Sequence, residues 1–285
     1  MPRMSAITAL DETAWADATW PLGTHIQDDG VVFAVHAPAA TRVQLEIYPE
    51  ALGATASAVF LPARGADGIW RARLGGLEAG ALVGFRVWGP NWPYDEAWTP
   101  GSDAGFIADL DEQGNRFNPN KVLFDPYSRE ITHNVYTDAL GRLGVDDGVL
   151  GTGGELVDGV PRRRIDTAPY APKGIVVAES AAPDGKPQLP PEQAIIYEAG
   201  VTQLTGHPSA ARLADLLAGE PGFEGVTDIP AQYQGTYKGA GLLAPYLKAA
   251  GVTTIELLPV HETNASETGR DGATNAWGYM TLSFF

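Results

Sequence analysis

The stretch GTYKGAGLLAPYLKAAGVTTIELLPVHETNASETGRDGATNAWGYMTLSFF, residues 235–285, decides the fold of this chain. An apolar stripe at helical spacing runs through residues 242–247, and Pro245 falls in the first turn, where proline is tolerated. Gly251 follows the stripe and would end the helix. Residues 252–260 are rich in Val, Ile, Leu and Thr, which predicts a buried strand of a parallel sheet. A helix, a glycine and a buried strand in this order form one unit of a β/α repeat.

Four segments upstream alternate apolar and polar residues at a period of two, as half-buried strands do. They cover residues 31–38, 41–48, 68–74 and 81–89. Turn signals separate them, and no periodic segment of helical length interrupts the series. Short strands at this spacing predict an antiparallel β-sandwich.

The sequence between the predicted sandwich and the β/α unit contains many turn signals. Residues 114–131 contain three of them, which indicates a hinge in which Asn118 and Lys121 brace the interface between domains. Residues 138–191 are rich in Gly, Asp and Pro, so we expect a surface excursion or a partly disordered connection. The arginines at 162–164 are expected to form a solvated surface.

The composition narrows the class of protein. With 285 residues and 44% apolar content, the chain can bury the core of one or two domains. No window approaches the length of a transmembrane helix, and the first residues do not resemble a secretory signal. The chain has no cysteine, which excludes disulfides and suits a cytoplasmic location. A net charge of −16 argues against nucleic acid or an anionic membrane as a partner.

Six motifs in consistent order resemble isoamylase-type debranching enzymes of the α-amylase superfamily of glycoside hydrolases. The resemblance covers the chain from about residue 31 to residue 285, and several motifs at matching spacing make it specific. The motifs are WGPNWPY (88–94), RFNPNKVLFDPYSREI (116–131), APYAPKG (168–174), IIYEAGVTQLT (195–205), QYQGTYKGAGLLAPYLKAAGVTTIELLPVHET (232–263) and WGYM (277–280).

The resemblance implies a mainly β plus α/β fold in four parts. An N-terminal extension covers residues 1–27, and an immunoglobulin-like β-sandwich of the isoamylase N-terminal type covers residues 28–115. A junction and long connector follow over residues 116–194. Residues 195–285 would form the first quarter of a (β/α)8 barrel, with the first strand at Ile195 to Val201.

The chain departs from the resembled family in the first predicted barrel strand. The family continues the Tyr-Glu pair with a valine-histidine-valine-arginine run, whereas this chain has Gly200 and Thr202 at the histidine and arginine positions. A glycine inside a buried strand would weaken its packing. The departure also removes any hydrogen bond that the histidine supplies.

Four aromatic residues lie close together after the predicted sandwich: Trp88, Trp92, Tyr94 and Trp98. Flat aromatic rings of this kind can stack against sugar rings. Because tryptophan is mostly buried, we instead expect Trp88 in the core and Trp92 between the sandwich and the barrel.

Residues at the carboxyl ends of the predicted barrel strands are the candidate substrate contacts. In the resembled family the tyrosine of the WGY motif stacks on glucose at the cleavage subsite, which implies Tyr279 here, with Trp277 beside it. His261 follows the second strand at the same face, where active sites of such barrels lie. For Tyr279 and His261 the alternative is a structural role in packing.

The resemblance also implies a calcium site beside the catalytic cleft, although no cofactor is required by the sequence itself. Its candidate ligands are Asn134, Glu262, Thr263 and Asn264. Calcium prefers six to eight oxygen ligands, and these residues supply only part of such a set. The alternative is an exposed polar loop without a metal.

No catalytic residue is assigned in this chain. Retaining glycosidases need two carboxylates across the scissile bond, and the family carries its nucleophile and its acid/base on later barrel strands. We therefore expect residues 1–285 to be inactive alone. The remaining acids have no precedent for this chemistry; they are Glu198, Glu256, Glu262, Glu267 and Asp271.

The resemblance implies the N-terminal part of a glycogen debranching enzyme that hydrolyses α-1,6-glucosidic branch linkages in glycogen or starch. The expected partners are an α-glucan, such as glycogen or amylopectin, and the remainder of the barrel. One alternative is a non-enzymatic α-glucan-binding module. Another is a fragment of a related branching or trehalose-releasing enzyme.

Overall fold

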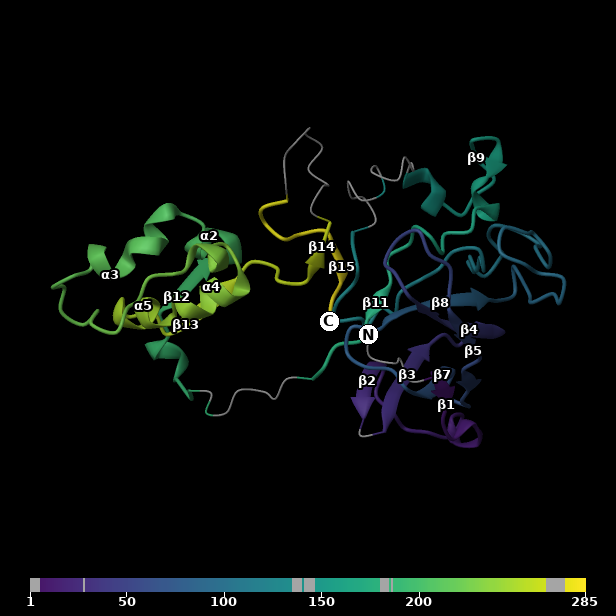
Figure 1. Cartoon of the computed structure of the whole chain (residues 1–285), viewed down its shortest axis with the longest axis horizontal. Coiled ribbons are helices and arrows are strands. Elements are labelled where there is room, and N and C mark those ends of the chain that lie inside the picture. Colours follow the sequence, from purple (N-terminus) through teal and green to yellow (C-terminus); the bar gives the residue numbers. More distant parts are fainter. Residues whose placement is uncertain are drawn as a thin grey trace. The chain divides into compact units, whose positions relative to one another are not determined.

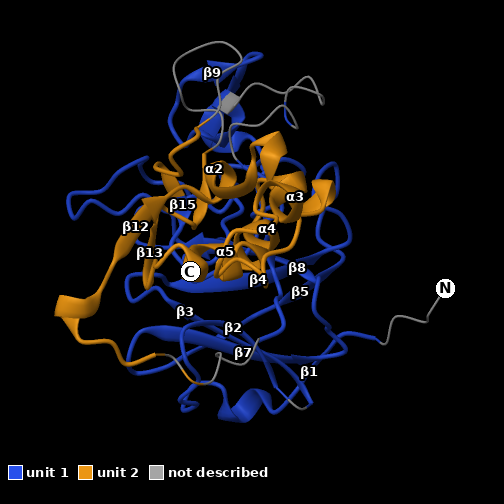
Figure 2. Cartoon of the chain, turned by 90° about the vertical axis from the view of Figure 1, so that its left-hand side faces the viewer, with its two compact units in different colours: residues 1–180, 282–285 blue, residues 181–281 orange. Residues whose placement is uncertain are grey.

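The computed structural model describes residues 6–27, 29–134, 140, 147–179, 185, 187–264 and 275–285. The chain divides into two compact units, coloured separately in Figure 2: residues 1–180 with 282–285, and residues 181–281. Within the described residues, no helix is long and apolar enough to cross a membrane.

The first unit contains two antiparallel sheets (Figure 1). One has the strand order β1-β7-β3-β2, with β6 beside β7, and the other has the order β11-β8-β4-β5. The strands are β1 Thr8–Ala9, β2 Gly23–Gln27, β3 Gly30–His36, β4 Arg42–Tyr48, β5 Ala58–Phe60, β6 Ala63–Arg64, β7 Ile69–Gly75, β8 Leu82–Trp88 and β11 Gly174–Ile175.

The core of the first unit lies between the two sheets, because alternate side chains of each strand point inward. Phe33 and Leu74 come from the first sheet and Leu45 and Phe85 from the second, and all four are buried. The predicted sandwich is therefore confirmed. Its strands extend beyond the predicted range 28–115, since β1 and β2 precede it and β11 follows it.

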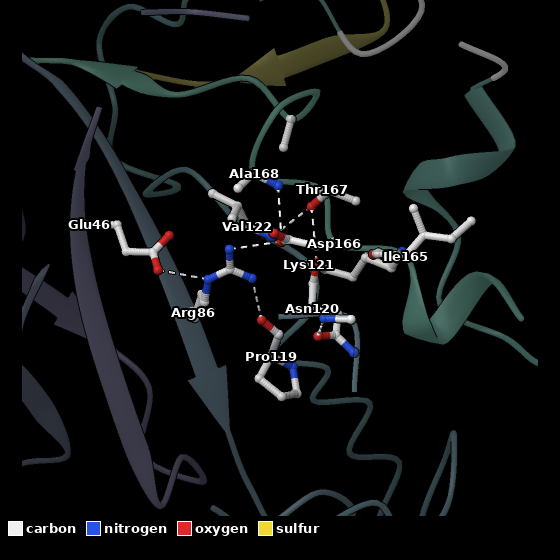
Figure 3. A network of polar contacts seen from close by, with 12 residues as sticks. Glu46, Arg86, Pro119, Asn120, Lys121, Val122, Ile165, Asp166, Thr167 and Ala168 are labelled. Atoms are coloured by element: carbon white, nitrogen blue, oxygen red, sulfur yellow. Dashed lines mark hydrogen bonds and ion pairs between the residues drawn. The ribbon is translucent and has the colours of Figure 1, made fainter. Parts of the chain in front are cut away.

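A buried ionic network covers the outer face of the second sheet (Figure 3). The Arg86 side chain on β8 pairs with Glu46 on β4 at 2.7 Å and with Asp166 at 2.8 Å. It also donates to the carbonyl of Pro119 at 2.8 Å. Burial disfavours the Arg86 charge, but the two carboxylates outweigh it and raise its pKa. The hydroxyl of Tyr48 donates a further hydrogen bond to Glu46.

Two buried lysines fasten the segment that follows the sandwich. Lys121 donates from Nζ to the carbonyls of Val149, Arg162 and Ile165, at 2.7 to 2.9 Å. Lys173 caps three carbonyls in the same way and lies over the Tyr48 ring. Burial lowers the pKa of each lysine to about 8.

These contacts involve the described part of residues 138–191, for which the sequence predicts a surface excursion or a partly disordered connection. Its described part contains η2 Asp147–Leu150, the hairpin β9 Leu156–Val157 and β10 Val160–Pro161, and η3 Arg162–Arg164. The described residues up to 179 belong to the first unit. Polar side chains far away in sequence hold this described part, and a local pattern in the sequence does not show them.

Two other predictions for this region change for the same reason. Asn118 donates to the Arg163 carbonyl, so Asn118 and Lys121 hold the connector within the first unit. The arginines of η3 are not merely solvated, since Arg162 pairs with Glu155 and the Arg163 guanidinium lies over Phe106.

The buried tryptophans belong to the first unit. Trp88 is 0% exposed and Trp92 is 1% exposed, which confirms the burial predicted for Trp88. Trp92 packs edge-to-face on Phe106 and donates from Nε1 to the Ala104 carbonyl at 2.8 Å. Trp92 is therefore buried by its own loop.

The second unit begins a β/α architecture, as predicted. Strands β12 Ile196–Ala199 and β13 Thr254–Leu257 pair in parallel. A small core lies among the connecting helices and contains Ala210, Ile229, Leu243 and Leu247. The connecting helices are α2 Val201–Thr205, η5 Pro208–Arg212, α3 Leu213–Leu216, η6 Ala231–Tyr233, α4 Tyr237–Leu242 and α5 Ala244–Ala249.

Local details of this unit differ from the sequence predictions. Gly200 does not lie inside a strand; it is the N-cap residue of α2, with φ −83°. The helix expected near residue 242 is split into α4 and α5, and Pro245 occupies the first turn of α5, as predicted. Gly251 follows with φ +89°, which suits a helix C-terminus.

The parallel strands are exposed, contrary to the prediction of a buried strand. Ile196 is 60% exposed, Tyr197 49% and Leu257 41%. Parallel sheets normally have both faces covered by other elements. In the described residues, β12 and β13 have only each other as strand partners.

Replacing Arg86 by methionine will lower the free energy of unfolding of the first unit by about 3–5 kcal/mol, because Glu46 and Asp166 lose their buried partner. Urea denaturation followed by tryptophan fluorescence measures the change. The control is Arg64→Met, since Arg64 is exposed and makes one hydrogen bond to Pro38, so its loss costs under about 1 kcal/mol. Equal effects of the two substitutions would contradict the role given to Arg86.

Replacing Asp125 by asparagine will remove a pH dependence of stability. Burial raises the pKa of Asp125 from 3.8 to about 6, and its Oδ2 atom has no hydrogen-bond partner in the described residues. Between these pH values the folded state keeps a proton that the unfolded state loses, so stability falls as pH rises. The advantage of Asp125→Asn will grow by up to about 3 kcal/mol between pH 4 and pH 7.

Urea denaturation of both proteins across this pH range provides the test. The control is Asp111→Asn, because hydrogen bonds from Asn115 lower the pKa of the half-buried Asp111. Removing that carboxylate changes the pH dependence with the opposite sign. A constant difference between wild type and Asp125→Asn would contradict the raised pKa.

Candidate functional site

A pocket of about 350 Å³ lies where the two parallel strands of the second unit end. The chain leaves β12 through Gly200 and leaves β13 through Leu258 and Pro259, and both turns contribute to its wall. Carboxyl ends of parallel strands are the usual position of binding sites in β/α folds. The lining residues include Gly200, Gln203, Tyr237, Leu258, Pro259, His261, Thr263, Asn275, Ala276, Trp277 and Gly278.

The WGY turn forms one wall of this pocket, and Asn275 holds its shape. Asn275 accepts a hydrogen bond from the Gly278 amide at 3.2 Å and donates from Nδ2 to the carbonyls of Asn264 and Tyr279. Gly278 has φ +77°, and a Cβ atom there would lie 2.3 Å from the Pro259 carbonyl oxygen. Glycine is therefore required where the turn approaches the end of β13.

Two further side chains connect the walls. Gln203 on α2 donates from Nε2 to the Ala276 carbonyl at 3.2 Å. The hydroxyl of Tyr237, at the start of α4, donates to the Val260 carbonyl at 2.9 Å. Sequence reasoning missed Gln203, Tyr237 and Asn275. The roles of Gln203 and Tyr237 depend on carbonyls distant in sequence, and that of Asn275 depends on the fold of its own turn.

The structure brings most of the predicted substrate contacts together. His261 and Trp277 line the pocket, and Tyr279 follows immediately in the WGY turn. Trp277 is 65% exposed and Tyr279 is 57% exposed, so both rings are accessible. Their roles in substrate binding stay predictions.

The predicted calcium ligands are divided between the units. Asn134 belongs to the first unit, whereas Glu262, Thr263 and Asn264 belong to the second. Glu262 and Thr263 form β14, which pairs with β15 Thr281–Ser283, and Asn264 is 1% exposed. No cluster of three or more His, Asp or Glu side chains suited to a metal occurs among the described residues. The oxygen donors present are chemically suited to calcium, but the site stays a prediction.

Carboxylates are absent from the described lining of the pocket. Glu198 and Glu256 are opposite each other in the β12–β13 register and are exposed, but neither lines the pocket. Glu267 and Asp271 lie outside the described residues. The described pocket presents the exposed Trp277 ring and several polar side chains, but its described lining lacks the two carboxylates that retaining hydrolysis of a glycoside requires.

Comparison with known proteins first shows which family of domains the sandwich resembles. Residues 21–128 match carbohydrate-binding module 48, the isoamylase N-terminal domain. A solved product complex of a multi-modular glycogen-degrading pneumococcal virulence factor, SpuA, aligns with a TM-score of 0.50 and 18% identity. That alignment covers 88% of this chain and 20% of the other, and at this identity it shows a shared fold.

Curated relatives extend the similarity beyond the sandwich. Isoamylase of Pseudomonas amyloderamosa is 36% identical over 297 aligned residues, which cover 100% of this chain and 34% of the relative. A glycogen debranching enzyme of Yersinia enterocolitica is 33% identical, with coverage of 92% and 32%. The chain thus spans about a third of the length of these relatives. It is similar over its whole length to the isoamylase, and its residues 21–128 match the N-terminal domain of isoamylases.

Replacing Gly278 by alanine will disrupt the WGY turn, because a positive φ costs a non-glycine residue about 1–2 kcal/mol and the new Cβ atom meets the Pro259 carbonyl. Hydrogen exchange of the amides of residues 275–280 should accelerate by at least about tenfold. The matched control is Gly241→Ala on α4, where a Cβ atom meets nothing within 4 Å. That substitution should leave the turn unchanged and stabilise the helix by about 0.5–1 kcal/mol.

Proposed function

We propose that this chain is the N-terminal part of an enzyme that hydrolyses α-1,6-glucosidic branch linkages in glycogen or starch. The observation that carries the proposal is the similarity to isoamylase along the whole chain, at 36% identity. The carbohydrate-binding-module sandwich supports α-glucan as the ligand. We also propose a cytoplasmic location, which the absence of cysteine from the 285 residues suits.

The pocket at the strand ends would contribute a glucose subsite of the cleft. Exposed aromatic rings stack on the apolar faces of sugars, and Trp277 and Tyr279 are accessible beside the pocket. His261 would add a polar contact. Beside this subsite, Glu262, Thr263 and Asn264 would supply oxygen ligands to calcium.

The exposed strands support a second part of the proposal, namely that further barrel strands complete the second unit. Ile196, Tyr197 and Leu257 expose large apolar surfaces on a parallel pair. Covering both faces of such a pair with helices and neighbouring strands is the usual way in which it is stabilised. The catalytic carboxylates would come from those additional strands, so residues 1–285 would not hydrolyse glucan alone.

Purified residues 1–285 will be retained by glycogen in a pull-down but will release no reducing sugar from it. Release of reducing sugar would overturn the proposal that the catalytic carboxylates come from barrel strands outside residues 1–285. Failure to bind glycogen would remove the glucan-binding part of the proposal. Retention alone also fits a non-enzymatic glucan-binding module, so a second experiment is needed.

A chimera distinguishes the N-terminal part of a glucan hydrolase from a non-enzymatic glucan-binding module. Residues 1–285 replace the aligned third of the Pseudomonas amyloderamosa isoamylase, and hydrolysis of α-1,6 linkages in amylopectin is measured. An active chimera is expected, and Tyr279→Ala within it should lower kcat/KM by about tenfold or more, a loss of about 1.4 kcal/mol. The control is Leu216→Ala on α3, which is 55% exposed and does not line the pocket. A folded but inactive chimera would favour the binding-module alternative.

A further inference from the structure

Gly200 and Gln203 lie three residues apart at the start of α2, and both line the pocket at the WGY turn. Gly200 is the N-cap residue, and Gln203 is the third residue of the helix. A glutamine at this helix position often turns back to accept a hydrogen bond from the N-cap amide. Among the described residues no such bond forms, and the Gln203 side chain instead donates to the Ala276 carbonyl at 3.2 Å.

The Gln203 side chain fills the space that a side chain at residue 200 would need. A Cβ atom on Gly200 would lie 2.1 Å from Oε1 and 3.0 Å from Cδ of Gln203, and Cβ atoms do not approach Oε1 so closely. The Gly200 backbone, with φ −83° and ψ 143°, is one that any residue can adopt. Glycine is therefore required at residue 200 by the Gln203 amide and not by the backbone conformation.

The hydrogen bond to Ala276 fixes the orientation of the Gln203 amide group. A carbonyl oxygen can only accept, so Nε2 must face Ala276, and Oε1 then lies on the side of Gly200. Among the described residues, no donor of the protein bonds to Oε1. Gln203 is exposed and lines the pocket, so this acceptor is available to a ligand.

The same hydrogen bond holds the backbone next to Trp277. Ala276 directly precedes Trp277, whose ring is 65% exposed, so the direction of the ring depends on the backbone of its turn. Asn275 holds this turn from within through the Gly278 amide. Gln203 holds it from α2, since its bond joins the first helix of the unit to the Ala276 carbonyl.

We propose that Gln203 is a positioning residue for Trp277 and a polar contact for the ligand, and that Gly200 provides the space on which both roles depend. The Nε2 atom holds the turn through Ala276, while Oε1 accepts a hydrogen bond from a hydroxyl group of the bound sugar. The proposal rests on the proposed function, since it takes the pocket as a glucose subsite.

Hydrogen exchange of the Gly278 amide at pH 7 tests the positioning role in residues 1–285. Gln203→Ala should accelerate this exchange about fivefold, as expected for the loss of one hydrogen bond. Gln203→Glu should do the same, because a carboxylate fills the same space but cannot donate to the Ala276 carbonyl. The matched control is Gln232→Ala, since Gln232 is exposed on η6 and does not line the pocket. Unchanged exchange in both Gln203 variants would overturn the positioning role.

A double-mutant cycle tests the role of Gly200. Gly200→Ala should accelerate exchange of the Gly278 amide as much as Gln203→Ala does, and combining the two substitutions should accelerate it no further. Gly241→Ala should leave this exchange unchanged, because a Cβ atom there meets nothing within 4 Å. An additive effect of Gly200→Ala, or none, would overturn the dependence of Gln203 on Gly200.

Calorimetry with maltoheptaose tests the ligand contact separately. Gln203→Ala should weaken binding about tenfold, whereas Gln203→Glu, which keeps an acceptor oxygen, should weaken it only about threefold. Binding that is lost in Tyr279→Ala but unchanged in Gln203→Ala would overturn the acceptor role and leave the glucose subsite in place. A wild-type chain that does not bind maltoheptaose would overturn the subsite and the acceptor role together, and the exchange experiments would still decide the positioning role.

Discussion

The first unit depends on one buried guanidinium. Arg86 on β8 is 2% exposed and binds Glu46 on the neighbouring strand, while its other edge reaches Asp166 (Figure 3). A charge in such a position is costly unless it is paired, so the segment that carries Asp166 must lie against the sheet. In this position the segment also offers backbone carbonyls to Lys121 and Lys173, whose hydrogen bonds fix its described residues in place. The covering layer and the sandwich therefore form one cooperative structure.

The elements that the sequence predicted well are those whose signal is local. β3, β4, β7 and β8 alternate at a period of two, and the unit of α5 and β13 carries its own proline and glycine boundaries. Predictions failed where long-range polar contacts decide the structure. The sequence around Lys121 gives no sign of a structural role. That role comes from its hydrogen bonds to the Arg162 and Ile165 carbonyls, about 40 residues further along the chain.

The same distinction applies to the candidate site. Tyr279, Trp277 and His261 could be predicted because a motif resembles a known family, and the structure brings them to one pocket or its edge. Gln203 and Tyr237 could not be predicted, since each acts through a carbonyl on another segment. Gly200 shows the opposite error: its place in a family pattern suggested a strand, but the chain turns into α2 there.

Alternation along β8 also explains why the role of the aromatic residues could not be decided from sequence. Phe85 and Val87 point into the sandwich, so Trp88 points to the opposite face, where a half-exposed sheet would place a ligand-binding ring. Tyr94 and Trp98 cover that face, and Trp88 is buried by them. The accessible aromatic rings thus lie on the loop after β8 and not on β8 itself. The exposure of Tyr94 and Trp98 depends on their packing against Trp88, a property that spacing in the sequence does not encode.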